Sequence, residues 1–144
     1  MSKHILLVDD DDLMRRSLAF NLEQAGYRAS TAETAEDALA MARREHPDLI
    51  LLDIVMPGMN GYEVCRRLKS DKQTRGIPVI FISALDQLMD KVKAFAVGGV
   101  DYVTKPFSQR ELVSRVRAVL RRTETTSAGT HGLIEVVDRL KLDF

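Results

Sequence analysis

The chain has 144 residues, which is enough for one compact domain with a sizeable core and too short for two ordinary ones. Its hydrophobic content of 45% and charged content of 29% are those of a globular protein and exclude a disordered or fibrous class. The 21 basic and 21 acidic side chains cancel, so direct binding of nucleic acid by this segment is not expected. Apolar runs such as Leu49 to Leu52 are far shorter than the roughly 20 residues of a membrane span, and no export signal precedes the first run. We therefore expect a cytoplasmic protein without a membrane span.

Short apolar runs alternate with amphipathic stretches five times along the chain. The runs are Ile5 to Val8, Arg28 to Thr31, Leu49 to Leu52, Val79 to Ser83 and Tyr102 to Thr104. Almost purely apolar runs are typical of parallel strands that helices cover on both faces, whereas the mixed second run is typical of a sheet edge. The pattern predicts an α/β fold, in which a five-stranded parallel sheet lies between two layers of helices.

Helical spacing recurs between the predicted strands. Two apolar stripes would face the core: Met14, Leu18 and Leu22 in one, and Leu112, Val113, Val116, Val119 and Leu120 in the other. Two helix starts are predicted by capping boxes: Thr34 with Asp37, and Ser108 with Glu111. The lone Cys65 cannot form an internal disulfide, and its helical position among apolar residues indicates a small core residue.

The composition changes after Arg122, where small polar residues without periodicity follow. We expect a domain over residues 1–122, a linker over residues 123–132 and a tail over residues 133–144. The tail has helical spacing from Leu133 to Phe144 and also alternates like a strand at Leu140, Leu142 and Phe144, so both assignments stay open. A segment this short cannot bury a core of its own, and we prefer the hypothesis that it begins a further domain.

Polar side chains follow four of the predicted strands. Asp9 and Asp10 end the first strand, Asp53 ends the third, Ser83 ends the fourth and Lys105 follows the fifth. The carboxyl ends of parallel strands meet at one edge of a sheet, so these groups are expected to lie together. Three neighbouring carboxylates repel one another unless a cation binds, and Mg²⁺ prefers such oxygen ligands together with phosphate. The sequence therefore predicts a site for a metal and a phosphate.

Each side chain of this set has a chemical role and an ordinary alternative. Asp53 would act as a nucleophile towards phosphorus, with Lys105 and Ser83 each contacting an oxygen of the phosphoryl group. Taken singly, such residues are more often turn formers, helix caps or surface charges, and Asp11 and Asp12 are expected to cap the first helix. The coincidence of the whole set at strand ends favours the phosphoryl site.

Four motifs in order resemble the receiver domains of bacterial two-component response regulators over residues 4–122. They are Leu7-Val8-Asp9-Asp10, Leu52-Asp53-Ile54-Val55-Met56-Pro57-Gly58-Met59-Asn60-Gly61, Ile82-Ser83-Ala84 and Asp101-Tyr102-Val103-Thr104-Lys105-Pro106-Phe107. The resemblance implies a flavodoxin-like, doubly wound fold with strand order 2-1-3-4-5 and five helices. It also implies a phosphorylation-dependent signalling switch, a phosphoacceptor regulator and not an enzyme with turnover.

The same resemblance implies roles for individual residues. Asp53 would be the phosphoacceptor, charged by a phosphohistidine on a sensor histidine kinase or phosphotransfer protein. Mg²⁺ would be held by Asp10 and Asp53, by Asp9 directly or through water, and by the backbone carbonyl of Val55. Lys105 would contact the phosphoryl group, and the bond between it and the following proline is expected to be cis.

A switch is implied on the face formed by the fourth helix, fifth strand and fifth helix. Ser83 would turn towards the phosphoryl group and vacate space into which Tyr102 rotates. Charged residues on this face resemble pairs that link two receivers in the subfamily with a winged-helix output: Lys91 with Glu111, and Asp101 with Arg115. Val100 replaces an acid often found there, which leaves Arg117 without one expected partner, so a homodimer and a solvated face stay equally open.

Three further alternatives concern the reaction and the output. Val55 and Leu85 are apolar where rapidly self-resetting relatives carry groups that orient water, which predicts slow self-dephosphorylation. A phosphohydrolase would need a second acid near its nucleophile, which Ile54 and Val55 do not supply. In a flavin-binding module, the acidic residues 9–12 would repel the phosphate of the flavin. The output is either a further domain beyond Phe144 or direct contact with a partner.

Overall fold

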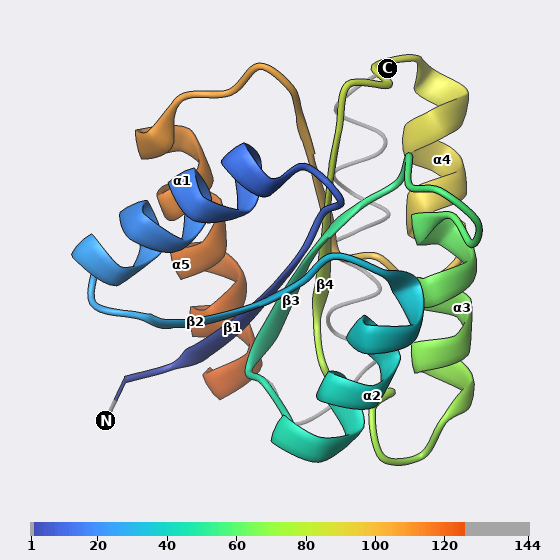
Figure 1. The fold of residues 1–144 in the computed structure, drawn as a ribbon, viewed down its shortest axis with the longest axis horizontal. Helices are drawn as coiled ribbons and strands as arrows, with labels where there is room; N and C mark the ends of the chain where they lie inside the picture. Colours follow the sequence, from blue (N-terminus) through green and yellow to red (C-terminus); the bar gives the residue numbers. More distant parts are fainter. Residues whose placement is uncertain (1, 126–144) are drawn as a thin grey trace.

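Five parallel strands form a sheet in the order β2-β1-β3-β4-β5 within residues 2–125, the part of the chain that the computed structural model describes (Figure 1). The strands are β1 (His4–Val8), β2 (Arg28–Ala32), β3 (Leu49–Asp53), β4 (Val79–Ser83) and β5 (Asp101–Thr104). The helices are α1 (Asp12–Gln24), α2 (Ala35–Glu45), α3 (Gly61–Ser70), α4 (Leu88–Ala96) and α5 (Gln109–Thr125). The predicted flavodoxin-like fold, with its strand order and five helices, is confirmed.

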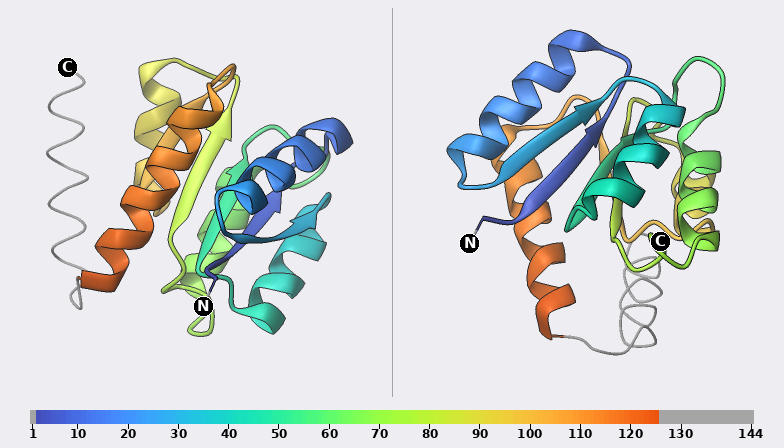
Figure 2. Two further views of the ribbon diagram at one scale, coloured as in Figure 1. Left: turned by 90° about the vertical axis from the view of Figure 1, so that its left-hand side faces the viewer. Right: turned by 60° about the horizontal axis from the view of Figure 1, so that its bottom comes forward.

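The sheet divides the interior into two cores because successive side chains of a strand point to opposite faces. Leu6 and Leu52 pack with α2, α3 and α4, whereas Leu7 and Leu51 pack with α1 and α5. Figure 2 shows this arrangement from two further sides, with α1 and α5 together on one face of the sheet. The described strands β1, β3 and β4 are buried along their whole length, as their apolar sequences require.

Hydrogen-bonded side chains begin three of the helices as the sequence indicates. The Thr34 side chain accepts a bond from the Asp37 N–H at 3.1 Å, and Ser108 accepts one from the Glu111 N–H at 3.0 Å. Asp11 caps α1, whereas Asp12 is already its first residue. Pro47 and Pro78 precede β3 and β4 and lie outside both strands, so neither interrupts the sheet.

Several boundaries differ by one to three residues from those expected, and β1 and β5 begin one residue earlier, at His4 and Asp101. β2 continues to Ala32, and β3 includes Asp53. α5 continues to Thr125, so the first three residues of the predicted linker are helical. Residues 126–132 of that linker and the tail over residues 133–144 lie outside the described part of the chain.

Cys65 lies in the core on α3 and is fully buried. Burial raises the pKa of its thiol to about 11, so the reactive thiolate is scarce at neutral pH. Between residues 2 and 125, no helix is both long and apolar enough to cross a membrane.

Candidate functional site

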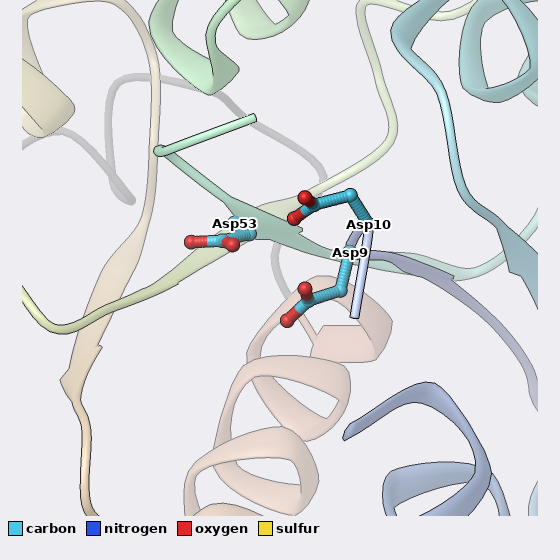
Figure 3. A group of neighbouring side chains, drawn as sticks. All are labelled: Asp9, Asp10 and Asp53. Atoms are coloured by element: carbon cyan, nitrogen blue, oxygen red, sulfur yellow. The ribbon is translucent and has the colours of Figure 1, made fainter. Parts of the chain in front are cut away.

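Three carboxylates meet where β1 and β3 end. These strands are neighbours in register, with Val8 beside Leu52, so Asp9 and Asp53 follow at adjacent positions. One oxygen from each of Asp9, Asp10 and Asp53 lies within 4.8 Å of the others, as Figure 3 shows. Asp9 and Asp53 are buried and Asp10 is exposed. The predicted carboxylate cluster is therefore present, with one side open to solvent.

Lys105 brings a positive charge to this cluster from the end of β5. Its Nζ lies 3.1 Å from Asp9 Oδ2 and 3.6 Å from Asp53 Oδ2. The Lys105 N–H donates to the Ser83 carbonyl at 2.7 Å, and the bond to Pro106 is cis, as expected. The chain is thus held so that an ammonium group from far along the sequence lies between two buried acids.

The pKa of Asp53 is raised from 3.8 to about 6. Burial is the largest cause, because it disfavours the charged carboxylate, and the neighbouring Asp9 acts in the same direction. Lys105 and the backbone N–H groups of Val55 and Ile54 lower it in part. A divalent cation beside Asp53 would lower the pKa further, since it favours the ionised form.

The donor set fits Mg²⁺ in its chemistry. All three side chains offer carboxylate oxygens, which is the ligand type that this hard cation prefers, and one open side leaves room for water and phosphate. The Val55 N–H donates to Asp53 Oδ1 at 3.4 Å, so the backbone nitrogen of the residue whose carbonyl was expected as a further ligand lies next to the acceptor. Val55 itself is 60% exposed.

Ser83 and Tyr102 meet at the loop that follows β4. Ser83 is fully buried, and its Oγ accepts a hydrogen bond from the Leu85 N–H at 3.2 Å. The Tyr102 hydroxyl donates to the Leu85 carbonyl at 2.5 Å, and Tyr102 is buried. Burial chiefly raises the pKa of Tyr102 to about 12, so this hydroxyl keeps its proton. Tyr102 is therefore buried and bonded to the loop after β4, and its rotation on phosphorylation remains a prediction.

Two residues of the site had no predicted role: Gly61, which ends the second motif, and Arg15. Gly61 begins α3 so close to the acceptor strand that a Cβ would overlap the Asp53 carbonyl oxygen, and its N–H donates to the Ile54 carbonyl at 2.8 Å. Arg15 is buried against the Asp9 carbonyl. The only sequence signal for Arg15 was its helical phase with Leu18, which places a charged residue on an apolar stripe.

On the predicted dimer face, one of the charge pairs forms within the chain. Arg115 Nη1 lies 3.0 Å from Asp101 Oδ1, and Arg115 Nε lies 3.5 Å from Glu111 Oε1. Asp101 is buried and the Arg115 side chain is 39% exposed, so the pair lies at the edge of the core. Both partners have contacts in a single chain, so a homodimer through them remains a prediction.

Comparison with known proteins decides the family. The model of the response regulator receiver domain matches residues 5–117. The chain belongs to the response regulator receiver family. The match includes the carboxylate cluster, Ser83 and Lys105, and it confirms the resemblance seen in the sequence.

Several relatives of this receiver domain are transcriptional regulators by name. It is 48% identical over 123 residues to the phosphate regulon transcriptional regulatory protein PhoB of Pseudomonas aeruginosa, covering 85% of this chain and 54% of PhoB. It is 45% identical over 124 residues to the alkaline phosphatase synthesis transcriptional regulatory protein PhoP of Bacillus subtilis, covering 86% of this chain and 51% of PhoP. The chain thus spans about half the length of these curated relatives.

A solved receiver has the same fold. The CheY-like response regulator receiver domain protein from Methanospirillum hungatei superimposes with a TM-score of 0.81 at 31% identity, covering 86% of this chain and 98% of that protein. A receiver domain therefore accounts for nearly all of the described residues.

Proposed function

We propose that this receiver accepts a phosphoryl group on Asp53 from a phosphohistidine of a sensor histidine kinase or phosphotransfer protein. The observation that carries the proposal is the position of Lys105, whose Nζ is within 4 Å of both Asp9 and Asp53. Phosphoryl transfer needs mainly a positioned nucleophile and positive charge near the equatorial oxygens, and this edge of the sheet supplies both.

In the proposed reaction, an Asp53 carboxylate oxygen attacks phosphorus in line with the phosphohistidine bond. The new P–O bond forms as the P–N bond breaks, and the imidazole nitrogen keeps the electron pair of the broken bond. Lys105 contacts one oxygen of the transferred group, and the Ser83 hydroxyl donates a hydrogen bond to another. Mg²⁺ would be held by Asp9, Asp10, Asp53 and the Val55 carbonyl, and it would neutralise charge on the phosphoryl oxygens.

The direct test uses acetyl phosphate as donor, with and without MgCl₂, and intact mass spectrometry as readout. We expect one phosphoryl group per chain, dependent on Mg²⁺ and lost in Asp53→Asn. Labelling that persists in Asp53→Asn would contradict the proposal. Sustained release of phosphate from many phosphate esters would favour a phosphohydrolase, and a yellow purified protein would favour a flavin-binding module.

The phosphorylated state is proposed to be long-lived, which makes the chain a switch and not a catalyst with turnover. Val55 and Leu85 lie two residues after Asp53 and Ser83 and carry apolar side chains that are 60% and 37% exposed, so neither offers a group to orient an attacking water. We expect the label on Asp53 to persist for minutes in Mg²⁺ without a phosphatase. Loss of the label within seconds would rule out this part of the proposal.

The output is proposed to act through the face formed by α4, β5 and α5. The named transcriptional relatives are about twice the length of the matched segment, which supports a DNA-binding domain after the receiver in a longer protein. Phosphorylation would change this face and with it a homodimer contact or an output domain. The reading frame that follows Phe144 tests this, and a stop there favours a single-domain shuttle that acts by direct contact.

A further inference from the structure

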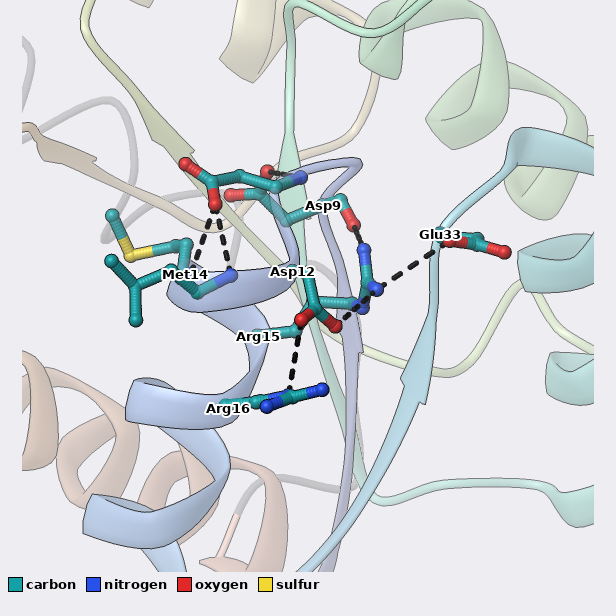
Figure 4. A network of polar contacts seen from close by, with 8 residues as sticks. Asp9, Asp12, Met14, Arg15, Arg16 and Glu33 are labelled. Carbon is teal, nitrogen blue, oxygen red and sulfur yellow. Dashed lines mark hydrogen bonds and ion pairs between the residues drawn. The ribbon is translucent and has the colours of Figure 1, made fainter.

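Arg15 is a buried cation directly beneath the carboxylate cluster. Its side chain is 11% exposed, although it belongs to the first turns of α1, where charged residues ordinarily face solvent. Its Nη1 donates to the Asp9 carbonyl at 2.7 Å (Figure 4). Its Nη2 lies 3.0 Å from Asp12 on the same helix and 3.5 Å from Glu33, which follows β2. One guanidinium group thus joins three segments of the chain.

Hydrogen bonds hold the backbone of Asp9 in both of the peptide units that flank its Cα. Its N–H donates to the Ala32 carbonyl at 3.2 Å, and its carbonyl accepts the bond from Arg15. That carbonyl belongs to the peptide bond between Asp9 and Asp10, so holding it fixes the plane that contains the Asp10 N and Cα atoms, from which the Asp10 side chain extends. Turning this peptide would move one carboxylate relative to the other.

Asp10 is the member of the cluster that most needs such support. The Asp9 carboxylate accepts a hydrogen bond from the Asp11 N–H at 2.9 Å and forms an ion pair with Lys105. The Asp10 side chain, in contrast, is exposed. Across residues 2–125, no hydrogen bond or ion pair holds the Asp10 carboxylate. Its place in the cluster therefore depends on the backbone that carries it.

We infer that Arg15 is a positioning residue for the Mg²⁺ site, because it fixes the peptide between Asp9 and Asp10 so that both carboxylates face Asp53. This inference rests on the Mg²⁺ site of the proposed function. Arg15 does not touch the cation or the phosphoryl group. It acts by removing the conformational freedom that Asp10 would otherwise lose when the cation binds, which strengthens binding.

The test is isothermal titration of the 144-residue chain with MgCl₂ alone, at a pH well above the pKa of Asp53. Arg15→Met keeps much of the apolar length of the side chain and removes the guanidinium group. We expect Mg²⁺ affinity to fall about tenfold, the lower end of what loss of a group behind a metal ligand costs. Arg15→Lys keeps one donor within reach of the Asp9 carbonyl and should restore part of the affinity.

Arg16→Met is a matched control on the same helix. Arg16 is 78% exposed and pairs with the same Asp12 at 3.0 Å, but the contacts to the Asp9 carbonyl and Glu33 belong to Arg15. The two variants lose the same charge, and loss of a positive charge near the cluster would by itself strengthen Mg²⁺ binding, so a weaker affinity in Arg15→Met cannot come from the change in charge. We expect less than a twofold change for Arg16→Met.

Amide NMR spectra without metal separate positioning from loss of folding. In Arg15→Met we expect spectra of a folded protein with shifts at residues 9–11, together with the weaker Mg²⁺ binding. Equal affinity in Arg15→Met and wild type, or equal weakening in Arg15→Met and Arg16→Met, would overturn the inference and leave the proposed function standing. Absence of Mg²⁺ binding in the wild type would overturn both. If Arg15→Met does not fold, Arg15→Lys decides: unchanged affinity there overturns the inference, and a partial loss supports it.

Discussion

Asp53→Asn is expected to stabilise the metal-free protein at neutral pH, although it removes the phosphoacceptor. Folding raises the pKa of Asp53 from 3.8 to about 6, a change of about two units, each equivalent to about 1.4 kcal/mol. Between these pH values the folded state binds more protons than the unfolded state, so stability falls as pH rises through the window. Above it, the buried charge costs about 3 kcal/mol, and Asn, which does not ionise, avoids this cost.

Urea unfolding of both proteins in EDTA measures this effect. We expect the free energy of unfolding of Asp53→Asn to exceed that of wild type by up to about 3 kcal/mol above pH 7, and the difference to vanish near pH 4. Mg²⁺ should stabilise the wild type and narrow the gap, because it binds the folded state. The exposed Asp86→Asn makes the same chemical change as a control. A difference that is constant with pH, or that grows as pH falls, would refute the reasoning.

Three other substitutions probe the packing around the acceptor. Gly61→Ala places a Cβ against the Asp53 carbonyl and should lower both the stability of the protein and the rate of its labelling by acetyl phosphate. The control Gly76→Ala has open space around the new Cβ and should change neither. Equal effects of the two substitutions would contradict the close contact at Gly61. Phe81→Ala removes the largest fully buried side chain and should lower the free energy of unfolding in urea by about 3–5 kcal/mol; a loss below about 1 kcal/mol would mean that the site refills. Tyr102→Phe keeps the ring but loses the hydrogen bond to the Leu85 carbonyl, so phosphorylation should still occur, while the changes that it causes in the amide chemical shifts of α4 should become smaller than in wild type. Changes as large as those of wild type would exclude the hydroxyl from the switch.

Much of the carboxylate site was predictable from the sequence because a parallel sheet places the carboxyl ends of its strands, and the residues that follow them, at one edge. Once Val8 and Leu52 are recognised as the ends of adjacent buried strands, the acids that follow them have to meet. The same topology places Ser83, the last residue of β4, and Lys105, which follows β5, at this edge. No contact between these residues had to be known in advance.

Arg15 and Gly61 were not predictable in the same way, because their importance comes from backbone atoms that the sequence does not display. Arg15 matters through the carbonyl of Asp9, and Gly61 through the carbonyl of Asp53. A residue's type reveals what its side chain offers, but not which distant peptide group lies in front of it. The hydrogen bond of Tyr102 belongs to the same class, since its acceptor is the backbone carbonyl of Leu85.

The division of the interior by the sheet also bears on how the chain tolerates change. Leu51 and Leu52 are neighbours in sequence, yet one packs with α1 and α5 and the other with α2, α3 and α4. Substitutions at the two positions share no packing partners across the sheet, so their effects on stability should nearly add, whereas Leu52 and Phe81, which belong to the same core, should couple. Each side of the molecule is therefore free to accumulate its own compensating substitutions, with the acceptor at the edge that both sides share.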